Sequence, residues 1–153
     1  MKIAMGADHR GFALKEQLKD ELKKRYNYEI IDCGTDSEER CDFPVFAFAV
    51  SEIVSHNNAD YGVVICGSGD GVCVASNKVK GIRCTLVVNH EDAHRAKAHI
   101  NANVIAIGSE KTDLEEAIKI VNTFVDTEFL DGRYKQRIDI ISEYENEHWK
   151  VLF

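Results

Sequence analysis

Two glycine-rich turns combine residue types that can carry chemistry. The first is Gly6-Ala7-Asp8-His9-Arg10-Gly11, and the second is Cys66-Gly67-Ser68-Gly69-Asp70-Gly71. Glycines at the start of a helix let several backbone N–H groups point at one spot, which suits an anion or a developing oxyanion. Because thiolates are favoured at helix N-termini, the second turn predicts that Cys66 acts as a base.

The second turn differs from the better-known anion-binding loops. A Walker loop ends in Gly-Lys-Ser/Thr, whereas this turn ends in Asp70-Gly71-Val72, and a dinucleotide fingerprint would follow the first strand instead of the third. A cysteine phosphatase loop has arginine six residues after the cysteine, where Val72 stands. A phosphoacceptor receiver domain would end the third strand in aspartate, and here Ile65 is followed by Cys66. A thiol beside a cradle of N–H groups remains.

Short apolar runs alternate with longer amphipathic ones, which predicts strands that alternate with helices. The expected strands are 2–5, 29–33, 61–65, 82–88 and 104–107, and the expected helices are 12–26, 46–55, 72–78, 91–98, 114–125 and 132–144. This alternation predicts an α/β fold, a three-layer α/β/α sandwich around a Rossmann-like parallel sheet with the strand order 2-1-3-4-5. In that order ligands bind where the carboxyl ends of strands one and three meet, which brings the two glycine-rich turns together.

The composition limits the class of protein. With 153 residues, 44% of them hydrophobic, the chain is expected to form one globular domain. A net charge of −7 argues against nucleic acid or an anionic membrane as partners. No long apolar run occurs, so we expect a cytoplasmic protein. The five cysteines lack C-x-x-C spacing and are expected to be thiols; Cys33, Cys73 and Cys84 are expected in the core.

Five motifs resemble those of the ribose-5-phosphate isomerase B family. They follow one another in the family's order: Gly6-Ala7-Asp8-His9-Arg10-Gly11-Phe12, Ile65-Cys66-Gly67-Ser68-Gly69, Ser76-Asn77-Lys78 with Gly81-Ile82-Arg83, Asn101-Ala102-Asn103-Val104, and Gly132-Arg133 with Gln136-Arg137. The related galactose-6-phosphate isomerase subunits share part of the pattern. The resemblance implies reversible isomerisation of ribose 5-phosphate to ribulose 5-phosphate, a step of the non-oxidative pentose phosphate pathway. It implies no metal and no organic cofactor.

The resemblance also implies a role for each site residue. Cys66 would move a proton between C1 and C2, and His99 with Ser68 would assist ring opening. The implied substrate-binding residues are Asp8, His9, Gly67, Gly69, Asp70, Gly71, Asn101, Arg133 and Arg137. Among them, the amides of residues 67–71 would hold the enediolate oxygen, Asp8 the sugar hydroxyls, and His9 with the two arginines the phosphate. For Asp8 the alternative is a helix N-cap.

Topology separates two parts of this predicted site. His99 immediately precedes the fifth strand and so lies at the amino edge of the sheet, opposite Cys66. Arg133 and Arg137 share one face of the last expected helix. The helix after strand five returns the chain to that same edge and so brings both arginines there. We therefore expect a homodimer with shared active sites, or a tetramer of such dimers. Residues 1–153 would form one isomerase domain, with the helix and tail from about residue 132 to 153 packing on the partner.

Four residues depart from the family pattern. Phe43 replaces a tyrosine, Ile100 an asparagine, Tyr134 a histidine, and Glu110 an arginine that commonly reaches the phosphate. Two alternatives therefore stay open: an isomerase of a hexose 6-phosphate (allose or galactose), and a non-catalytic sensor of sugar phosphates. Substrate profiling distinguishes the first alternative, and a Cys66→Ala variant distinguishes the second.

Overall fold

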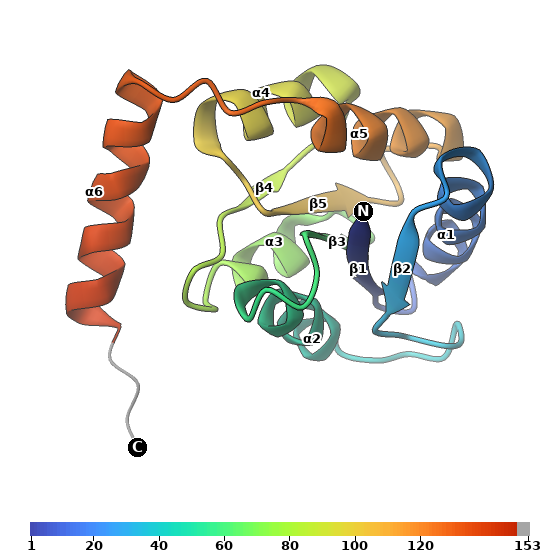
Figure 1. Ribbon diagram of the computed structural model, residues 1–153. Helices are drawn as coiled ribbons and strands as arrows, with labels where there is room; N and C mark the ends of the chain where they lie inside the picture. Colours follow the sequence, from blue (N-terminus) through green and yellow to red (C-terminus); the bar gives the residue numbers. More distant parts are fainter. Residues whose placement is uncertain (150–153) are drawn as a thin grey trace.

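The computed structural model describes residues 1–149 and shows a five-stranded parallel sheet with helices on both faces (Figure 1). The strands are β1 Lys2–Ala7, β2 Glu29–Asp32, β3 Tyr61–Cys66, β4 Cys84–Leu86 and β5 Val104–Gly108. The helices are α1 Phe12–Tyr26, α2 Phe43–Ser55, α3 Asp70–Ser76, α4 His90–Ile100, α5 Leu114–Asp126 and α6 Arg133–His148. The predicted α/β class is confirmed.

The sheet separates two hydrophobic cores. On one face, α1, α4 and α5 pack against the strands, and Leu18, Leu22 and Phe124 are almost fully buried there. On the other face, α2 and α3 bury Val50 and Val72. Figure 1 shows the same division, with α4 and α5 on one side of the sheet and α2 and α3 on the other. The predicted three-layer sandwich is therefore confirmed.

The predicted strand order was wrong at one end of the sheet. The observed order is β2-β1-β3-β5-β4, so β5 lies between β3 and β4. Burial explains the exchange: every residue of β5 is buried, whereas only Cys84 is buried among the three residues of β4. A strand that is apolar along its whole length suits the centre of a sheet covered on both faces, and a short strand with a polar residue suits the edge. The predicted adjacency of β1 and β3 is confirmed.

Some element boundaries also differ from the prediction. The second helix begins at Phe43, three residues before the predicted start at residue 46. Proline is tolerated in the first helical turn because its missing N–H has no partner there. The edge strand β4 pairs only with β5 and is shorter than the predicted 82–88.

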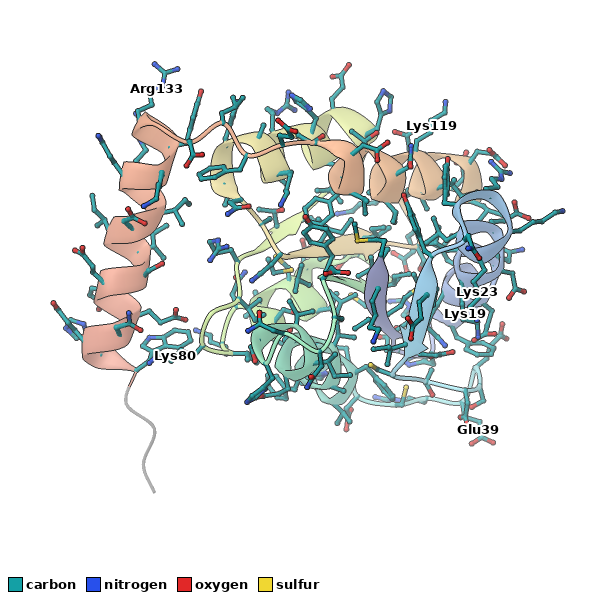
Figure 2. All side chains as sticks on the ribbon, in the orientation of Figure 1. Lys19, Lys23, Glu39, Lys80, Lys119 and Arg133 are labelled. Atoms are coloured by element: carbon teal, nitrogen blue, oxygen red, sulfur yellow. The ribbon has the colours of Figure 1, made fainter. Side chains whose placement is uncertain are left out.

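The last helix stands beside the edge of the sheet, away from most of the body (Figure 1). The helix begins at Arg133, whose side chain points away from the molecule in Figure 2. Ile140, Ile141 and Tyr144 are more than half exposed. A groove of about 280 Å³ lies between the C-terminal half of α6 and the β4 side of the sheet. It is lined by Ile82, Arg83, Cys84, Ile141, Tyr144, Trp149 and neighbouring residues. The rest of the predicted tail, 150–153, lies outside the described residues.

No helix within the described part of the chain combines the length and the apolar character that crossing a bilayer requires.

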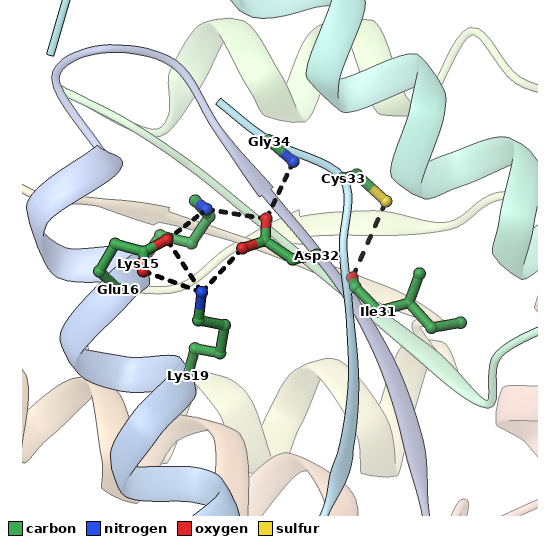
Figure 3. A network of polar contacts seen from close by, with 7 residues as sticks. All are labelled: Lys15, Glu16, Lys19, Ile31, Asp32, Cys33 and Gly34. Carbon is green, nitrogen blue, oxygen red and sulfur yellow. Dashed lines mark hydrogen bonds and ion pairs between the residues drawn. The ribbon is translucent and has the colours of Figure 1, made fainter. Parts of the chain in front are cut away.

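A buried ammonium group joins α1 to β2. The residue Lys15 is completely buried, although it lies on a helix whose other buried residues are leucines. Its Nζ donates to Glu16 Oε1 and to Asp32 Oδ1, each at 2.8 Å (Figure 3). Lys19 donates to the same two carboxylates, and the Gly34 N–H donates to Asp32 Oδ1 at 2.9 Å. A buried charge needs partners of this kind, so the network fixes α1 against the end of β2.

The network shifts the pKa of Asp32. Burial opposes ionisation of this carboxyl group, but the hydrogen bonds from Lys15, Lys19 and the Gly34 N–H outweigh burial and lower the pKa to about 2. On the other side, hydrogen bonds to Glu16 and Asp32 raise the pKa of Lys19 to about 12. Asp32 therefore stays charged wherever the fold is intact near neutral pH.

We expect Asp32→Asn to lower the free energy of unfolding at pH 7 by about 1–2 kcal/mol, a value reduced for solvent screening. A carboxyl group with a lowered pKa stabilises the fold above its unfolded pKa, and the contribution is lost as the pH falls toward the folded pKa. The difference between wild type and variant should therefore narrow from about pH 4 toward pH 2. Urea unfolding at several pH values measures it.

Asp139→Asn is the matched control. Asp139 accepts from Lys135 at 2.6 Å, but both side chains are about half exposed on α6. Its loss should change the free energy of unfolding far less than the loss of Asp32. Equal losses in the two variants, or a difference that stays constant in acid, would contradict the assigned role of the network.

Candidate active site

The turn after β1 presents an aspartate that organises its own backbone. Asp8 is buried, and its Oδ1 accepts from the N–H groups of Arg10 at 2.9 Å and Gly11 at 3.1 Å. The Asp8 N–H donates to Ile65 O at 3.2 Å, which ties the turn to the end of β3. The N-cap of α1 is Gly11, so Asp8 stabilises the turn ahead of the helix.

His9 is oriented by a loop far away in the sequence. Its Nδ1 accepts from the Cys41 N–H at 3.3 Å and lies 3.9 Å from Cys41 Sγ. With Nδ1 as an acceptor, Nε2 carries the ring proton and can donate to a ligand. This geometry suits the predicted role of His9 toward an anion.

Cys66 ends β3 and begins the second glycine-rich turn. It is 5% exposed, and the Gly69 N–H donates to its Sγ at 3.2 Å. This backbone donor fixes the position of the sulfur at the start of the turn. Gly69 makes this contact from a left-handed backbone with φ 83°. A Cβ on Gly69 would lie 2.5 Å from Leu86 Cδ1 and 3.0 Å from the Gly108 nitrogen, so a side chain has no room there.

The rest of the turn leads directly into α3. Ser68 Oγ accepts from the Asp70 N–H at 3.2 Å, which shapes the turn and leaves the hydroxyl able to donate. Asp70 is exposed, and Gly71 lies under the ring of Phe43, whose atoms would be 2.7–3.0 Å from a Cβ at that position. The apolar Phe43 ring therefore covers one side of the turn.

The loop after β5 lies against the same turn. The Ser109 N–H donates to Cys66 O at 2.9 Å, and the Glu110 N–H donates to Gly67 O at 3.0 Å. Glu110 Oε1 forms an ion pair with Arg10 Nη2 at 2.6 Å. The contact between Arg10 and Glu110 is not expected from the sequence, because the predicted strand order places another strand between β3 and β5. The opposite charges of Arg10 and Glu110 were the available signal.

Two of the remaining cysteines, Cys33 and Cys84, are less suited to act as bases. Burial raises the pKa of the Cys33 thiol. A hydrogen bond with Cys73, together with burial, raises the pKa of Cys84, whereas the same hydrogen bond lowers the pKa of Cys73. All five cysteines of the chain are free thiols. Cys66 is the cysteine that lies in a glycine-rich turn at the carboxyl edge of the sheet.

A second group of predicted residues gathers around Tyr134, at the start of α6. The rings of His99 and Tyr134 are stacked, with centroids 4.6 Å apart and planes 2° apart. The guanidinium carbons of Arg133 and Arg137 lie 5.0 and 5.9 Å from the Tyr134 centroid, and Arg133 Nη2 donates to the Tyr134 hydroxyl at 3.1 Å. Stacking and cation–π contact hold these side chains together. The sequence does not predict this role of Tyr134, which is notable there only because it replaces a histidine of the family pattern.

Asn101 lies apart from His99. It is the left-handed C-cap of α4, its carbonyl oxygen accepts from Arg83 Nη2 at 2.8 Å, and its Oδ1 accepts from Lys97 at 3.2 Å. It lines a polar cavity with Arg83 and Lys97, whereas His99 and Ile100 line a different one beside β4. The structure explains Asn101 as a helix cap, and its predicted contact with substrate stays a prediction.

Apart from Asn101, the predicted site residues form two groups within one chain. At the carboxyl edge of the sheet, β1, β3 and β5 bring together Asp8, His9, Cys66, Gly67, Ser68, Gly69, Asp70 and Gly71. At the end of α4 and the start of α6 are His99, Arg133 and Arg137. The cavity that His99 lines includes no residue of the glycine-rich turns.

Known proteins resemble this chain along nearly its whole length. The sequence profile of the Ribose/Galactose Isomerase family matches residues 3–141. Ribose-5-phosphate isomerase B of Escherichia coli is 39% identical over 144 residues, which cover 94% of this chain and 96% of that protein. The probable ribose-5-phosphate isomerase B of Mycoplasma genitalium is 41% identical over 147 residues, covering 95% and 96%.

Solved structures agree. Ribose-5-phosphate isomerase B of Clostridium thermocellum superposes with a TM-score of 0.93 at 42% identity, covering 97% of this chain and 99% of that one. The Mycoplasma genitalium enzyme with bound ribulose 5-phosphate superposes with a TM-score of 0.90 at 40% identity, covering 95% and 97%.

We expect Gly69→Ala to destabilise the fold by about 3 kcal/mol, because it adds both a left-handed alanine and a clash with Leu86 and the Gly108 backbone. The matched control is Gly81→Ala. Gly81 has a similar φ of 86°, but a Cβ there meets open space, so only about 1 kcal/mol of backbone strain is expected. Thermal and urea unfolding measure both values. Equal destabilisation by the two substitutions would mean that close packing around Gly69 is unimportant.

Proposed function

The chain belongs to the Ribose/Galactose Isomerase family, and on that basis we propose that it interconverts ribose 5-phosphate and ribulose 5-phosphate. The observation that carries the proposal is the Gly69 N–H on Cys66 Sγ, at the point where β3 ends beside the turn of Asp8. A buried sulfur held by a backbone donor, next to further N–H groups, is an arrangement for moving a proton between two carbons while charge develops on oxygen.

In the proposed reaction the sugar first opens to its aldehyde form. The thiolate of Cys66 then takes the proton from C2, and the electron pair moves through C1 to the carbonyl oxygen, giving an enediolate. N–H groups of the turn 67–71 stabilise that oxygen. Cys66 returns the proton to C1 as the C2 hydroxyl becomes the ketone. The proton of that hydroxyl passes to the C1 oxygen. The sulfur ends the cycle as a thiolate, and neither a metal nor a redox cofactor is needed.

We expect Cys66→Ala to lower kcat for ribose 5-phosphate by roughly a thousand-fold, since the variant loses the proton-transferring group. Cys33→Ala is the control, because it removes a thiol that lies outside the turns. Formation of ribulose 5-phosphate measures both. If the wild-type protein forms ribulose 5-phosphate no faster than Cys66→Ala does, a sugar-phosphate sensor is the better interpretation. Faster turnover of allose 6-phosphate or galactose 6-phosphate than of ribose 5-phosphate would indicate a hexose phosphate substrate.

The second half of the proposal is that each site is shared between two subunits. His99, Arg133 and Arg137 gather at the end of α4, apart from Cys66 of the same chain. The exposed apolar residues of α6, including Ile141 and Tyr144, offer a surface for a partner. In a symmetric homodimer the His99 group of one subunit would face Cys66 of the other. His99 would assist ring opening there, and the arginines with His9 would bind the phosphate.

Mixing two inactive variants tests the shared site. In a mixed dimer of Cys66→Ala and His99→Asn subunits, a shared arrangement leaves one site with both side chains intact and the other with neither. Random association should therefore restore about a quarter of wild-type activity, whereas each variant alone stays inactive. Isomerase assays after co-refolding measure the recovery. No recovery in demonstrably mixed dimers would show that His99 and Cys66 act within one subunit, or not together.

A further inference from the structure

One close ion pair beside the candidate active site has no part in the mechanism above. Arg10 Nη2 and Glu110 Oε1 are 2.6 Å apart, and their side chains are 62% and 52% exposed. An ion pair as exposed as this adds little to stability, because water screens the charges. Its position is therefore more informative than its strength.

The pair lies directly against the residue that follows Cys66. A Cβ added to Gly67 would lie 3.0 Å from Glu110 Oε1, 3.2 Å from Arg10 Cδ and 3.3 Å from Arg10 Nε. The two charged side chains thus cover the first peptide of the glycine-rich turn. A substrate bound at Cys66 must lie close to them.

The backbones under both side chains are fixed, although the charged ends reach solvent. The Arg10 N–H donates to Asp8 Oδ1 at 2.9 Å, and the Arg10 carbonyl oxygen accepts from Ser109 Oγ at 2.9 Å. The Glu110 N–H donates to Gly67 O at 3.0 Å. Each charge therefore extends from a rigid support over the same spot, so little ordering is required when a ligand binds.

A guanidinium group in this position suits a phosphate. Its planar set of N–H donors can bind two phosphate oxygens at once, and its closest approach to Glu110 is through Nη2. His9, next in the chain, offers a further donor on the same turn. The carboxylate of Glu110 holds the guanidinium in the free protein but repels a phosphate dianion.

We propose that Arg10 binds the phosphate of the substrate, and that Glu110 is the carboxylate with which this phosphate competes for Arg10. The assignment rests on the proposed function for the identity of the substrate. In the family pattern an arginine lies in the loop after β5, where this chain has Glu110. The proposed phosphate-binding cation, Arg10, lies instead on the turn after β1.

The first test removes the guanidinium. Arg10→Met should raise KM for ribose 5-phosphate, and the inhibition constant of inorganic phosphate, by roughly 10- to 100-fold with kcat changed little. Arg25→Met is the matched control, because Arg25 forms comparable exposed ion pairs with Glu21 and Glu115 on α1 and α5. An unchanged KM, or a loss confined to kcat, would overturn the role of Arg10.

The second test changes its partner. Glu110→Gln should lower the inhibition constant of inorganic phosphate several-fold, because it removes a competing negative charge. The double variant Arg10→Met with Glu110→Arg, which restores a cation from the other loop, should recover much of the lost phosphate affinity. Weaker phosphate inhibition in Glu110→Gln would overturn the competition, and no recovery in the double variant would show that Arg10 does more than supply charge.

The outcome can be separated from that of the proposed function. If wild type does not isomerise ribose 5-phosphate, the proposed function fails, while thermal stabilisation by inorganic phosphate still compares wild type with Arg10→Met. If wild type is active and the Arg10 variant binds phosphate equally well, only the assignment of Arg10 fails.

Discussion

The pairing of β5 with β3 positions the candidate active site, because the hydrogen bonds between the two segments continue beyond the ends of both strands. The ladder runs to Cys66 and Gly108, and the next two N–H groups, of Ser109 and Glu110, then donate to the carbonyl oxygens of Cys66 and Gly67. Cys66 is thus held through its main chain by a neighbouring strand, and its sulfur is held by the Gly69 N–H. With β4 beside β3, none of the β5 contacts would exist, and the turn would lack one wall.

The two groups of site residues are stabilised by different kinds of interaction. At the carboxyl edge of the sheet, backbone hydrogen bonds and close approach at glycines fix the positions of Asp8, Cys66 and the N–H groups around the sulfur. Around Tyr134, the half-buried His99 and the exposed Arg133 are held by contact with one ring. The first group is held by backbone that belongs to the sheet, whereas the second depends on a helix that stands beside the body. Fixed backbone of this kind suits the proton transfer proposed for Cys66.

The sequence predicts those features whose causes are local. The leucines of α1 repeat with the helical period, and the glycine-rich turns follow apolar runs, so both the helix and the edge where the turns meet were predictable. Strand order was not, since β4 and β5 are both short apolar runs and the choice between them depends on how completely each is buried. The burial of Lys15 could not be predicted either, because its partner Asp32 belongs to a different element of the fold.

The groove between α6 and the β4 side gives the molecule an intrinsic optical reporter. Trp149 is the single tryptophan of the sequence, and it lines that groove together with Ile82 and Ile141. Indole emission shifts to longer wavelength when water reaches the ring. Fluorescence excited selectively at the indole therefore reads the docking of α6 without any label and without a signal from the rest of the fold. The same emission records whether another surface covers the groove, so the proposed dimerisation can be followed in the unmodified protein.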